Sequence, residues 1–215
     1  MYIPKHFEET RVDVLHALIE TYPLATLITH STRGLNANHV PMYLTPEPAP
    51  YGTLRAHVAR GNALVEDLTE NPDVLAVFQG PNAYISPSWY ATKEETGRVV
   101  PTWNYATVHA KGRARAIDDP VWLRAQITAL TERNEAPFAE PWSVDDAPAD
   151  YIDKLIGSIV GVEIELHALH GKWKVSQNQP AANAAGVLAG LRACDQLGAQ
   201  AMADLVRERA KVDPA

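Results

Sequence analysis

The spacing of apolar residues near the start of the chain predicts a helix. Val12, Leu15 and Ile19 recur at helical intervals within residues 8–21. Pro23 follows directly, and proline disfavours helical geometry in the residue before it. We therefore expect the first helix to end by residue 22.

After this helix, the pattern changes to short apolar stretches separated by turn residues. Gly, Pro, Asn and Ser interrupt these stretches, as is typical of strands joined by tight turns. Turns are expected at residues 31–34, 80–82 and 170–171. The strands are expected at residues 24–29, 35–45, 52–58, 74–79, 83–86, 158–166 and 172–176, with one long strand from the segment 100–105 to residue 117.

Helical patterns return between and after the strands. Residues 62–70 form one candidate helix, and a longer one should run to about residue 134, with Asp118 or Asp119 as its cap and Pro120 in its first turn. Polar stretches at 92–98 and 137–148 are interpreted as loops. Further helices are expected at residues 151–156, 180–193 and 195–211.

This order of elements favours an α+β fold: a barrel of short strands with flanking N- and C-terminal helices. The strands do not alternate regularly with helices, which argues against a doubly wound parallel sheet. We find no internal repeat and no clear domain boundary. The expectation is therefore a single domain over residues 1–215, with a C-terminal helical extension at about residues 180–211.

Charge narrows the choice of partners. The formal net charge of -7 provides no overall positive field that would attract nucleic acid. Lys111, Arg113 and Arg115 alternate on an expected strand, which is more typical of a solvated sheet face. Direct DNA binding is therefore doubtful.

The remaining compositional signals point to a cytoplasmic protein. No apolar run approaches the roughly 18 residues of a membrane span. The N-terminus lacks the pattern of a signal peptide. Cys194 is the only cysteine and cannot form an intramolecular disulfide. His167 and His170 are the closest histidine pair but lack further ligands at suitable spacing, so no metal site is expected.

Common catalytic and nucleotide-binding signatures are missing, yet three polar segments stand out. The first, residues 57–62, lies between an expected strand and an expected helix. Backbone N–H groups at a helix start, with Arg60 beside them, suit a phosphate group. Gly61 would allow close approach of a ligand. The structural alternative is a solvent-facing arginine and an asparagine cap.

The second segment combines residues 85–90 with residues 100–105, and the third is residues 172–178. Trp89 and Trp103 could line an apolar cavity that accepts an aromatic ring, or could simply pack the barrel ends. Lys174 could stabilise negative charge on such a ring, although a strand lysine is more often a solvated edge charge.

Together these segments resemble the PaiB family of FMN-binding negative transcriptional regulators. The resemblance implies a split β-barrel of the pyridoxine-phosphate oxidase type, working as a homodimer with FMN at the subunit interface. Two stretches depart from the family pattern, at residues 91–99 and 140–150, and leave any substrate pocket undefined. The matching stretches are MYIPKHF (1–7), PLATL (23–27), HVPMY (39–43), HVARGN (57–62), YISPSWY (84–90), VPTWNY (100–105) and WKVSQN (173–178).

The resemblance also implies which residues contact the flavin. It makes His57, Arg60 and Asn62 phosphate and ribityl contacts. It makes Thr102, Trp103 and Asn104, with Ser86 and Trp89, ring or ribityl contacts. Asn38 and His39 reach the same site, although strand alternation sends their side chains to opposite faces. Lys174, Gln177 and Asn178 approach from the C-terminal part of the chain.

Three functions remain open from the sequence. The first is an FMN-binding regulator, as the resemblance implies, although no helix-turn-helix is recognisable. The second is a flavin-dependent oxidoreductase or flavin reductase on the same barrel. The third is a haem-binding split barrel with His39, His57 or His109 as the axial ligand.

Overall fold

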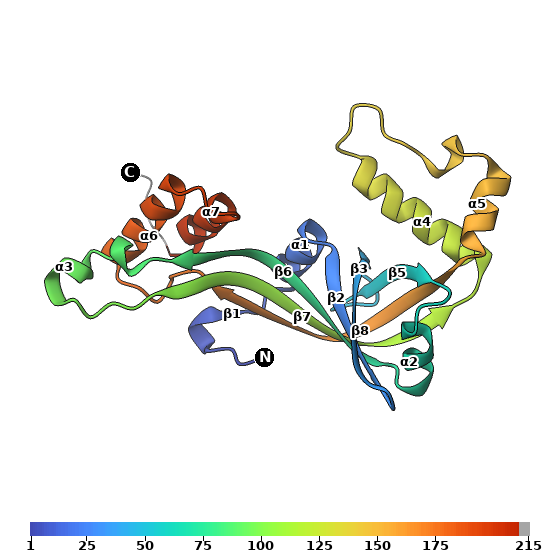
Figure 1. The fold of residues 1–215 in the computed structure, drawn as a ribbon, viewed down its shortest axis with the longest axis horizontal. Helices are drawn as coiled ribbons and strands as arrows, with labels where there is room; N and C mark the ends of the chain where they lie inside the picture. The colour runs from blue at the N-terminus through green and yellow to red at the C-terminus, as the bar shows by residue number, and fades with distance from the viewer. Residues whose placement is uncertain (211–215) are drawn as a thin grey trace. The chain divides into compact units, whose positions relative to one another are not determined.

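The structure, a computed structural model, describes residues 1–210 and is built on one sheet of eight strands within that range (Figure 1). The strand order is β3-β2-β6-β7-β8-β5-β4, and β1 pairs with β8. The combination of this sheet with separate helices confirms the α+β prediction. The strands are β1 (Glu8–Glu9), β2 (Leu24–Ser31), β3 (Gly34–Pro41), β4 (Tyr43–Thr45), β5 (Thr53–Ala59), β6 (Asp73–Ile85), β7 (Thr102–Ile117) and β8 (Ile159–Lys174).

Seven α-helices and three short 3-10 helices complete residues 1–210. The α-helices are α1 (Val12–Thr21), α2 (Leu64–Glu70), α3 (Thr92–Thr96), α4 (Pro120–Glu135), α5 (Ala149–Ile156), α6 (Ala181–Ala193) and α7 (Ala199–Arg209). The 3-10 helices are η1 (Lys5–Phe7), η2 (Pro87–Trp89) and η3 (Val144–Asp146).

The chain forms two compact units, each assembled from distant segments. Unit 1 contains residues 1–15, 79–108 and the described residues from 170 onward, whereas unit 2 contains residues 16–78 and 109–169. The long strands β6, β7 and β8 each contribute residues to both units. Neither unit is therefore a contiguous stretch of sequence.

Two predicted turns are wrong, because strand pairing and packing override the local turn signals. β6 continues through residues 80–82. Even-numbered residues are buried up to Gly80, and odd-numbered residues are buried from Ala83 onward. β8 continues through Gly171, which pairs with Glu9 of β1. A Cβ atom on Gly171 would lie 2.3 Å from Leu15 Cδ2, so this glycine serves close packing rather than a turn.

Several element boundaries also differ from the prediction. Residues 35–45 form two strands, β3 and β4, that occupy opposite ends of the strand order. The first helix begins at Val12 because Glu8–Glu9 pairs with β8 instead. α3 lies within the predicted loop 92–98, and α7 begins only at Ala199. Lys211, the predicted end of that helix, lies outside the described residues.

The predicted capping of α4 is confirmed. The Asp119 carboxylate accepts a hydrogen bond from Val121 N at 2.9 Å, and Pro120 occupies the first turn. α4 then buries Leu123 in an apolar cluster with Ile152 and Ile156 of α5. Capping and apolar burial together explain why this segment forms a long helix.

The loop between β2 and β3 is fastened to α2 by the buried carboxylate of Asp67. This carboxylate accepts hydrogen bonds from Ser31 Oγ at 2.7 Å, Asn36 Nδ2 at 3.1 Å, Arg33 Nη2 at 2.7 Å and Thr29 Oγ1 at 2.9 Å. These bonds, led by those from Ser31 and Asn36, lower the pKa of Asp67 far below its ordinary value. A buried charge with four donors holds α2 against the hairpin formed by β2 and β3.

Substitution of Gly161 tests the close packing between strand β8 and helix α4. A Cβ atom at Gly161 would lie 2.3 Å from Cζ3 of Trp122 on α4. We expect Gly161→Ala to lower the free energy of unfolding by roughly 1–3 kcal/mol, because the indole must shift. Urea denaturation measures this loss. The control is Gly61→Ala, since a Cβ atom there meets nothing within 4 Å; equal losses in the two variants would contradict the packing explanation.

Candidate functional site

The residues expected to contact the flavin fall into two groups, one in each unit. Unit 2 holds Asn38, His39, His57, Arg60 and Asn62. Unit 1 holds Ser86, Trp89, Thr102, Trp103, Asn104, Lys174, Gln177 and Asn178.

In unit 2, the structure joins β3 to the loop that enters α2. Asn62 Nδ2 donates a hydrogen bond to Asn38 Oδ1 at 3.0 Å, and Asn62 Oδ1 accepts one from Leu64 N at 2.9 Å. Asn62 therefore uses both ends of its amide. Asn38 Nδ2 is buried and has no hydrogen-bond partner among the described residues. His39, the next residue on β3, is exposed.

Arg60 lies just after β5 and is already paired. Its Nη1 and Nη2 atoms each donate to a carboxylate oxygen of Asp118 at 2.7 Å, and Nε donates to Gly157 O at 3.0 Å. Hydrogen bonding to Arg60 lowers the pKa of Asp118. Both side chains are largely exposed, with fractions of 44% and 63%. A phosphate that binds Arg60 must therefore share this guanidinium with Asp118.

In unit 1, polar residues from four elements surround a cavity of about 300 Å³. Four of the expected flavin contacts lie in its wall: Thr102 and Asn104 of β7, Lys174 at the end of β8, and Asn178. The full lining is Phe7, Tyr90, Thr92, Arg98, Val99, Val100, Thr102, Asn104, Lys174, Ser176, Asn178, Gln179 and Asn183.

The cavity has a positive wall. Arg98 and Lys174 are its two cationic residues, and no Asp or Glu contributes to its lining. Lys174 Nζ donates to Thr102 Oγ1 and, at 2.9 Å, to Trp103 O. Burial lowers the pKa of Lys174 from its ordinary value, and nearby Lys172 adds to this effect although Tyr105 opposes it. This arrangement suits an anionic group.

A buried hydrogen bond joins Asn104 and Ser176, two residues of the cavity wall. Asn104 is only 1% exposed, and its Nδ2 donates to Ser176 Oγ at 2.9 Å. Ser176 has a φ of 66°, in the left-handed region that residues other than glycine rarely adopt. Backbone strain of this kind concentrates at binding sites. The strained residue lies directly in the cavity wall.

The other four expected contacts in unit 1 lie outside the cavity lining. Ser86 Oγ accepts from Ser88 N at the start of η2, and Gln177 bonds the backbone of Trp173 and Val175. The Trp89 indole packs where α6 has Gly190, whose added Cβ would lie 2.2 Å from Trp89 Cδ2. Trp103 is 53% exposed and packs edge-to-face against Tyr84.

Sequence reasoning missed Arg98, Asn183 and Gln126. Arg98 ends the polar stretch 92–98 that the sequence predicts to be a loop, and the sequence offers no signal that it lines a cavity. Asn183 is a buried polar residue in the Ala- and Gly-rich helix α6, where it accepts from Thr92 N at 3.1 Å. Gln126 is buried in α4 and lies 2.8 Å from His57 Nδ1. A polar residue on an apolar helix face was the available signal for both.

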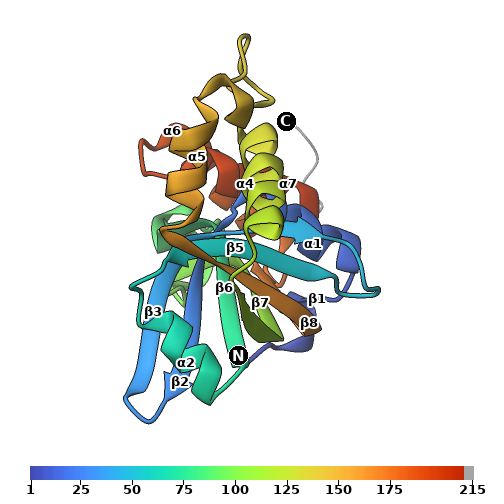
Figure 2. The same ribbon diagram turned by 90° about the vertical axis from the view of Figure 1, so that its right-hand side faces the viewer.

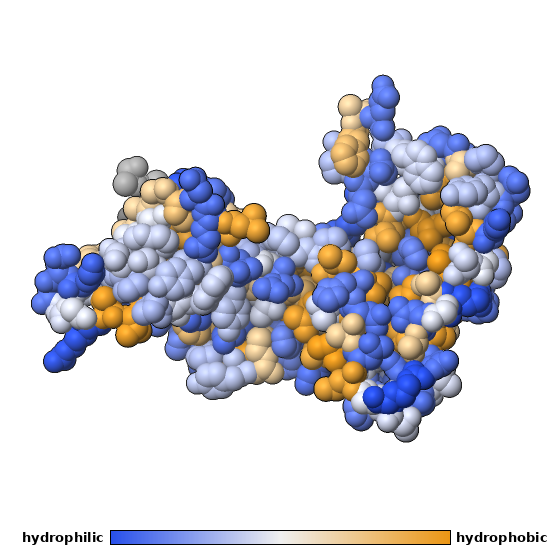
Figure 3. All heavy atoms as spheres, in the orientation of Figure 1, coloured by the Kyte–Doolittle hydropathy of each residue, from blue (hydrophilic) through white to orange (hydrophobic). Residues whose placement is uncertain are grey.

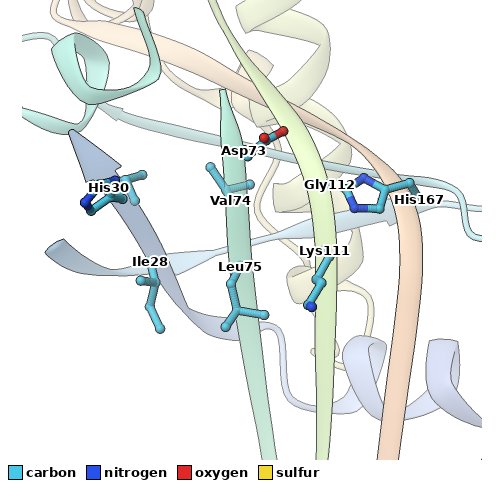
Figure 4. Close-up of a pocket in the computed structure, with 9 residues that line it drawn as sticks. Ile28, His30, Asp73, Val74, Leu75, Lys111, Gly112 and His167 are labelled. Carbon is cyan, nitrogen blue, oxygen red and sulfur yellow. The ribbon is translucent and has the colours of Figure 1, made fainter. Parts of the chain in front are cut away.

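A second pocket, of about 550 Å³, lies in unit 2 (Figure 4). Ile28 and His30 of β2, Asp73 and Leu75 of β6, Lys111 of β7 and His167 of β8 contribute to its lining. None of the expected flavin contacts belongs to it.

Residues 1–210 contain no group of three or more His, Cys, Asp or Glu side chains placed to hold a metal ion. Within the same range, no helix has the length and apolar character needed to cross a membrane.

Comparisons with known proteins agree on one family. Residues 1–168 match the family model described as "Putative FMN-binding domain". An uncharacterised protein of Emericella nidulans is 33% identical, covering 99% of this chain and 98% of its own. The Bacillus subtilis protease synthase and sporulation protein PAI 2 is 29% identical, covering 98% of this chain and 99% of its own.

Solved structures support the fold. The flavocytochrome Anf3 of Azotobacter vinelandii superposes with a TM-score of 0.57 at 12% identity, covering 80% of this chain and 72% of its own. At this identity the likeness concerns the fold alone. It agrees with the split-barrel architecture expected from the sequence.

Proposed function

Because this chain belongs to the PaiB-like family of FMN-binding proteins, we propose that the carboxylate-free cavity of unit 1 holds an anionic part of the cofactor. The chain is an FMN-binding split-barrel protein. FMN, when bound, supplies an aromatic ring that accepts and returns electrons.

The observation that carries this proposal is the combination of Arg98, Lys174 and Asn104 around one cavity. An ammonium group, a guanidinium group and a buried amide offer the charge-assisted donors that a phosphate or a reduced flavin edge requires. At about 300 Å³ the cavity is at the lower end of small-molecule sites. It therefore suits one end of FMN better than the whole molecule.

The unit 2 group supplies a second set of proposed contacts. Asn38 has an unused buried donor, and Asn62 accepts a hydrogen bond from Leu64 N at the start of α2. Arg60 lies in the loop just after β5, the strand that carries His57. These are hydroxyl- and phosphate-binding chemistries, as expected for the ribityl phosphate. Ser86, Trp89, Trp103 and Gln177 stay proposed flavin contacts only through the family resemblance.

We also propose that the protein is a homodimer whose flavin sites lie at the subunit interface. In this proposal, residues 1–215 of each copy form a single domain. Exposed apolar surface supports this proposal. On α4 and α5, Val121, Tyr151 and Leu155 are exposed, and Figure 3 shows hydrophobic surface around these helices. Exposed apolar patches commonly mark an interface.

For the biological role, we propose flavin-linked negative regulation in the cytoplasm without direct DNA contact. The resemblance to the PaiB family of negative transcriptional regulators supports a regulatory role, and the similar PAI 2 is named a protease synthase and sporulation protein. The net charge of -7 argues against a DNA-binding surface. Oxidation of NADH or NADPH by the holoprotein would instead favour a flavin oxidoreductase, and a Soret band on haem titration would favour a haem protein.

We expect Lys174→Gln to weaken FMN binding about 10- to 100-fold. The substitution removes a charge-assisted hydrogen bond worth roughly 1.5–3 kcal/mol. Quenching of FMN fluorescence measures the dissociation constant. Lys111→Gln, at an exposed position of β7 outside the expected flavin contacts, is the matched control. An affinity in Lys174→Gln equal to that of the control would remove this cavity from the flavin site.

A pair of variants tests whether Arg60 binds phosphate. Arg60→Ala and Asp118→Ala break the same ion pair, so a purely structural role predicts equal effects. If Arg60 contacts FMN, Arg60→Ala lowers the affinity, whereas Asp118→Ala leaves it unchanged or raises it because the guanidinium is released. FMN titration of both variants decides between these roles, and equal losses would assign Arg60 to structure alone.

One sedimentation experiment tests both the proposed homodimer and the proposed absence of direct DNA binding. The FMN-loaded protein should sediment with twice the mass of the 23.6 kDa chain. A labelled fragment of the regulated promoter should sediment unchanged beside it at physiological salt. A monomer would reject the dimer, and comigration of the fragment would reject regulation without DNA contact.

A further inference from the structure

Gln126 is a polar residue in a place that would ordinarily hold an apolar one. It lies on α4 and is only 3% exposed. Its Nε2 atom is buried and has no hydrogen-bond partner in residues 1–210. A buried donor without a partner costs free energy. The position therefore calls for a role that an apolar side chain cannot fill.

The partner of Gln126 is His57, one of the proposed flavin contacts. Gln126 Oε1 lies 2.8 Å from His57 Nδ1. A carbonyl oxygen can only accept a hydrogen bond, so Nδ1 of His57 must carry the proton. In the neutral ring, Nε2 is then the free acceptor.

Helix α4 is held over His57 by close packing within unit 2, and Figures 1 and 2 both show α4 beside β5. His57 of β5 pairs in register with Gly161 of β8. The missing side chain of Gly161 leaves room for Trp122, whose ring would lie 2.3 Å from a Cβ atom there. Trp122 and Gln126 are four residues apart and so share one face of α4. Backbone packing therefore fixes the position of the Gln126 amide.

The charged groups beside this face form their own cluster. Arg55 Nε donates to Glu163 Oε2 at 3.0 Å, and Arg115 Nη2 donates to Glu163 Oε1 at 2.5 Å. The Arg55 guanidinium also lies 6.0 Å from the Trp122 ring centroid. Glu163 is thus occupied by two arginines, and the polar contact that the structure shows for the imidazole is the one with Gln126.

We propose that Gln126 is a positioning residue that holds His57 as its Nδ1–H tautomer, so that Nε2 accepts a hydrogen bond from a ribityl hydroxyl of FMN. This inference rests on the proposed role of His57 in flavin binding. It refines that role, because a neutral ring with a free Nε2 acceptor suits a hydroxyl donor rather than a phosphate. Gln126 itself does not touch the cofactor.

Two substitutions distinguish a positioning role of Gln126 from a purely structural role. Gln126→Leu keeps the approximate size but removes the acceptor, so His57 should lose its tautomer preference and FMN affinity should fall roughly tenfold. Gln126→Glu removes the amide nitrogen but keeps an acceptor oxygen of the same reach. Nδ1 of His57 should therefore stay the protonated nitrogen, and the FMN affinity lost in Gln126→Leu should be largely retained in Gln126→Glu.

The tautomer is read from long-range ¹H–¹⁵N NMR spectra of the ligand-free protein, and FMN affinity from fluorescence titration. An Nε2–H tautomer in the wild type, or an unchanged tautomer in Gln126→Leu, overturns the positioning role. If Gln126→Leu does not fold, an Nε2–H tautomer in Gln126→Glu overturns it. Unchanged affinity in His57→Ala instead removes His57 from the flavin site, a separate failure of the proposed function.

Discussion

The fold depends on side chains packing directly onto the backbone of strand β8. At Gly161 the indole of Trp122 occupies the space of a side chain, and at Gly171 the side chain of Leu15 does so. Both glycines lie within one uninterrupted strand that pairs with β5 and β1. An added carbon at such points forces neighbouring side chains to shift, because protein interiors are densely packed. The two glycines therefore allow Leu15 of α1 and Trp122 of α4 to approach the strand closely.

The same packing places polar groups where their function is proposed. Because Trp122 fixes α4 against β8, the Gln126 amide meets His57 on the paired strand β5. In unit 1, β7 and the end of β8 bring Asn104 and Ser176 into hydrogen-bond contact. Each contact joins residues far apart in the sequence. In each contact, apolar packing fixes the helix or strand, and that element then places the polar side chain beside its hydrogen-bond partner.

Electrostatics distinguishes the two groups of proposed contacts. In unit 1, Arg98 and Lys174 face a cavity without carboxylates, so their charge is available to a ligand. In unit 2, Arg60 is neutralised by Asp118 at the surface. An anionic ligand gains more from the first arrangement, because charges in a partly buried cavity are less screened than those in an exposed ion pair. Lys174 is therefore the more decisive residue to test.

The α+β class, the capped helix α4, the long strand β7 and the family with its FMN cofactor could be predicted from the amino-acid sequence. These features depend on local periodicity, caps and motifs that adjacent residues carry. That β6 and β8 run through apparent turns became evident in the folded structure, since strand pairing outweighs the local preferences of Pro81 and Gly171. The folded structure also brings Arg98 and Asn183 into the cavity wall and Gln126 to His57. Such contacts arise from packing between distant segments, which no local pattern records.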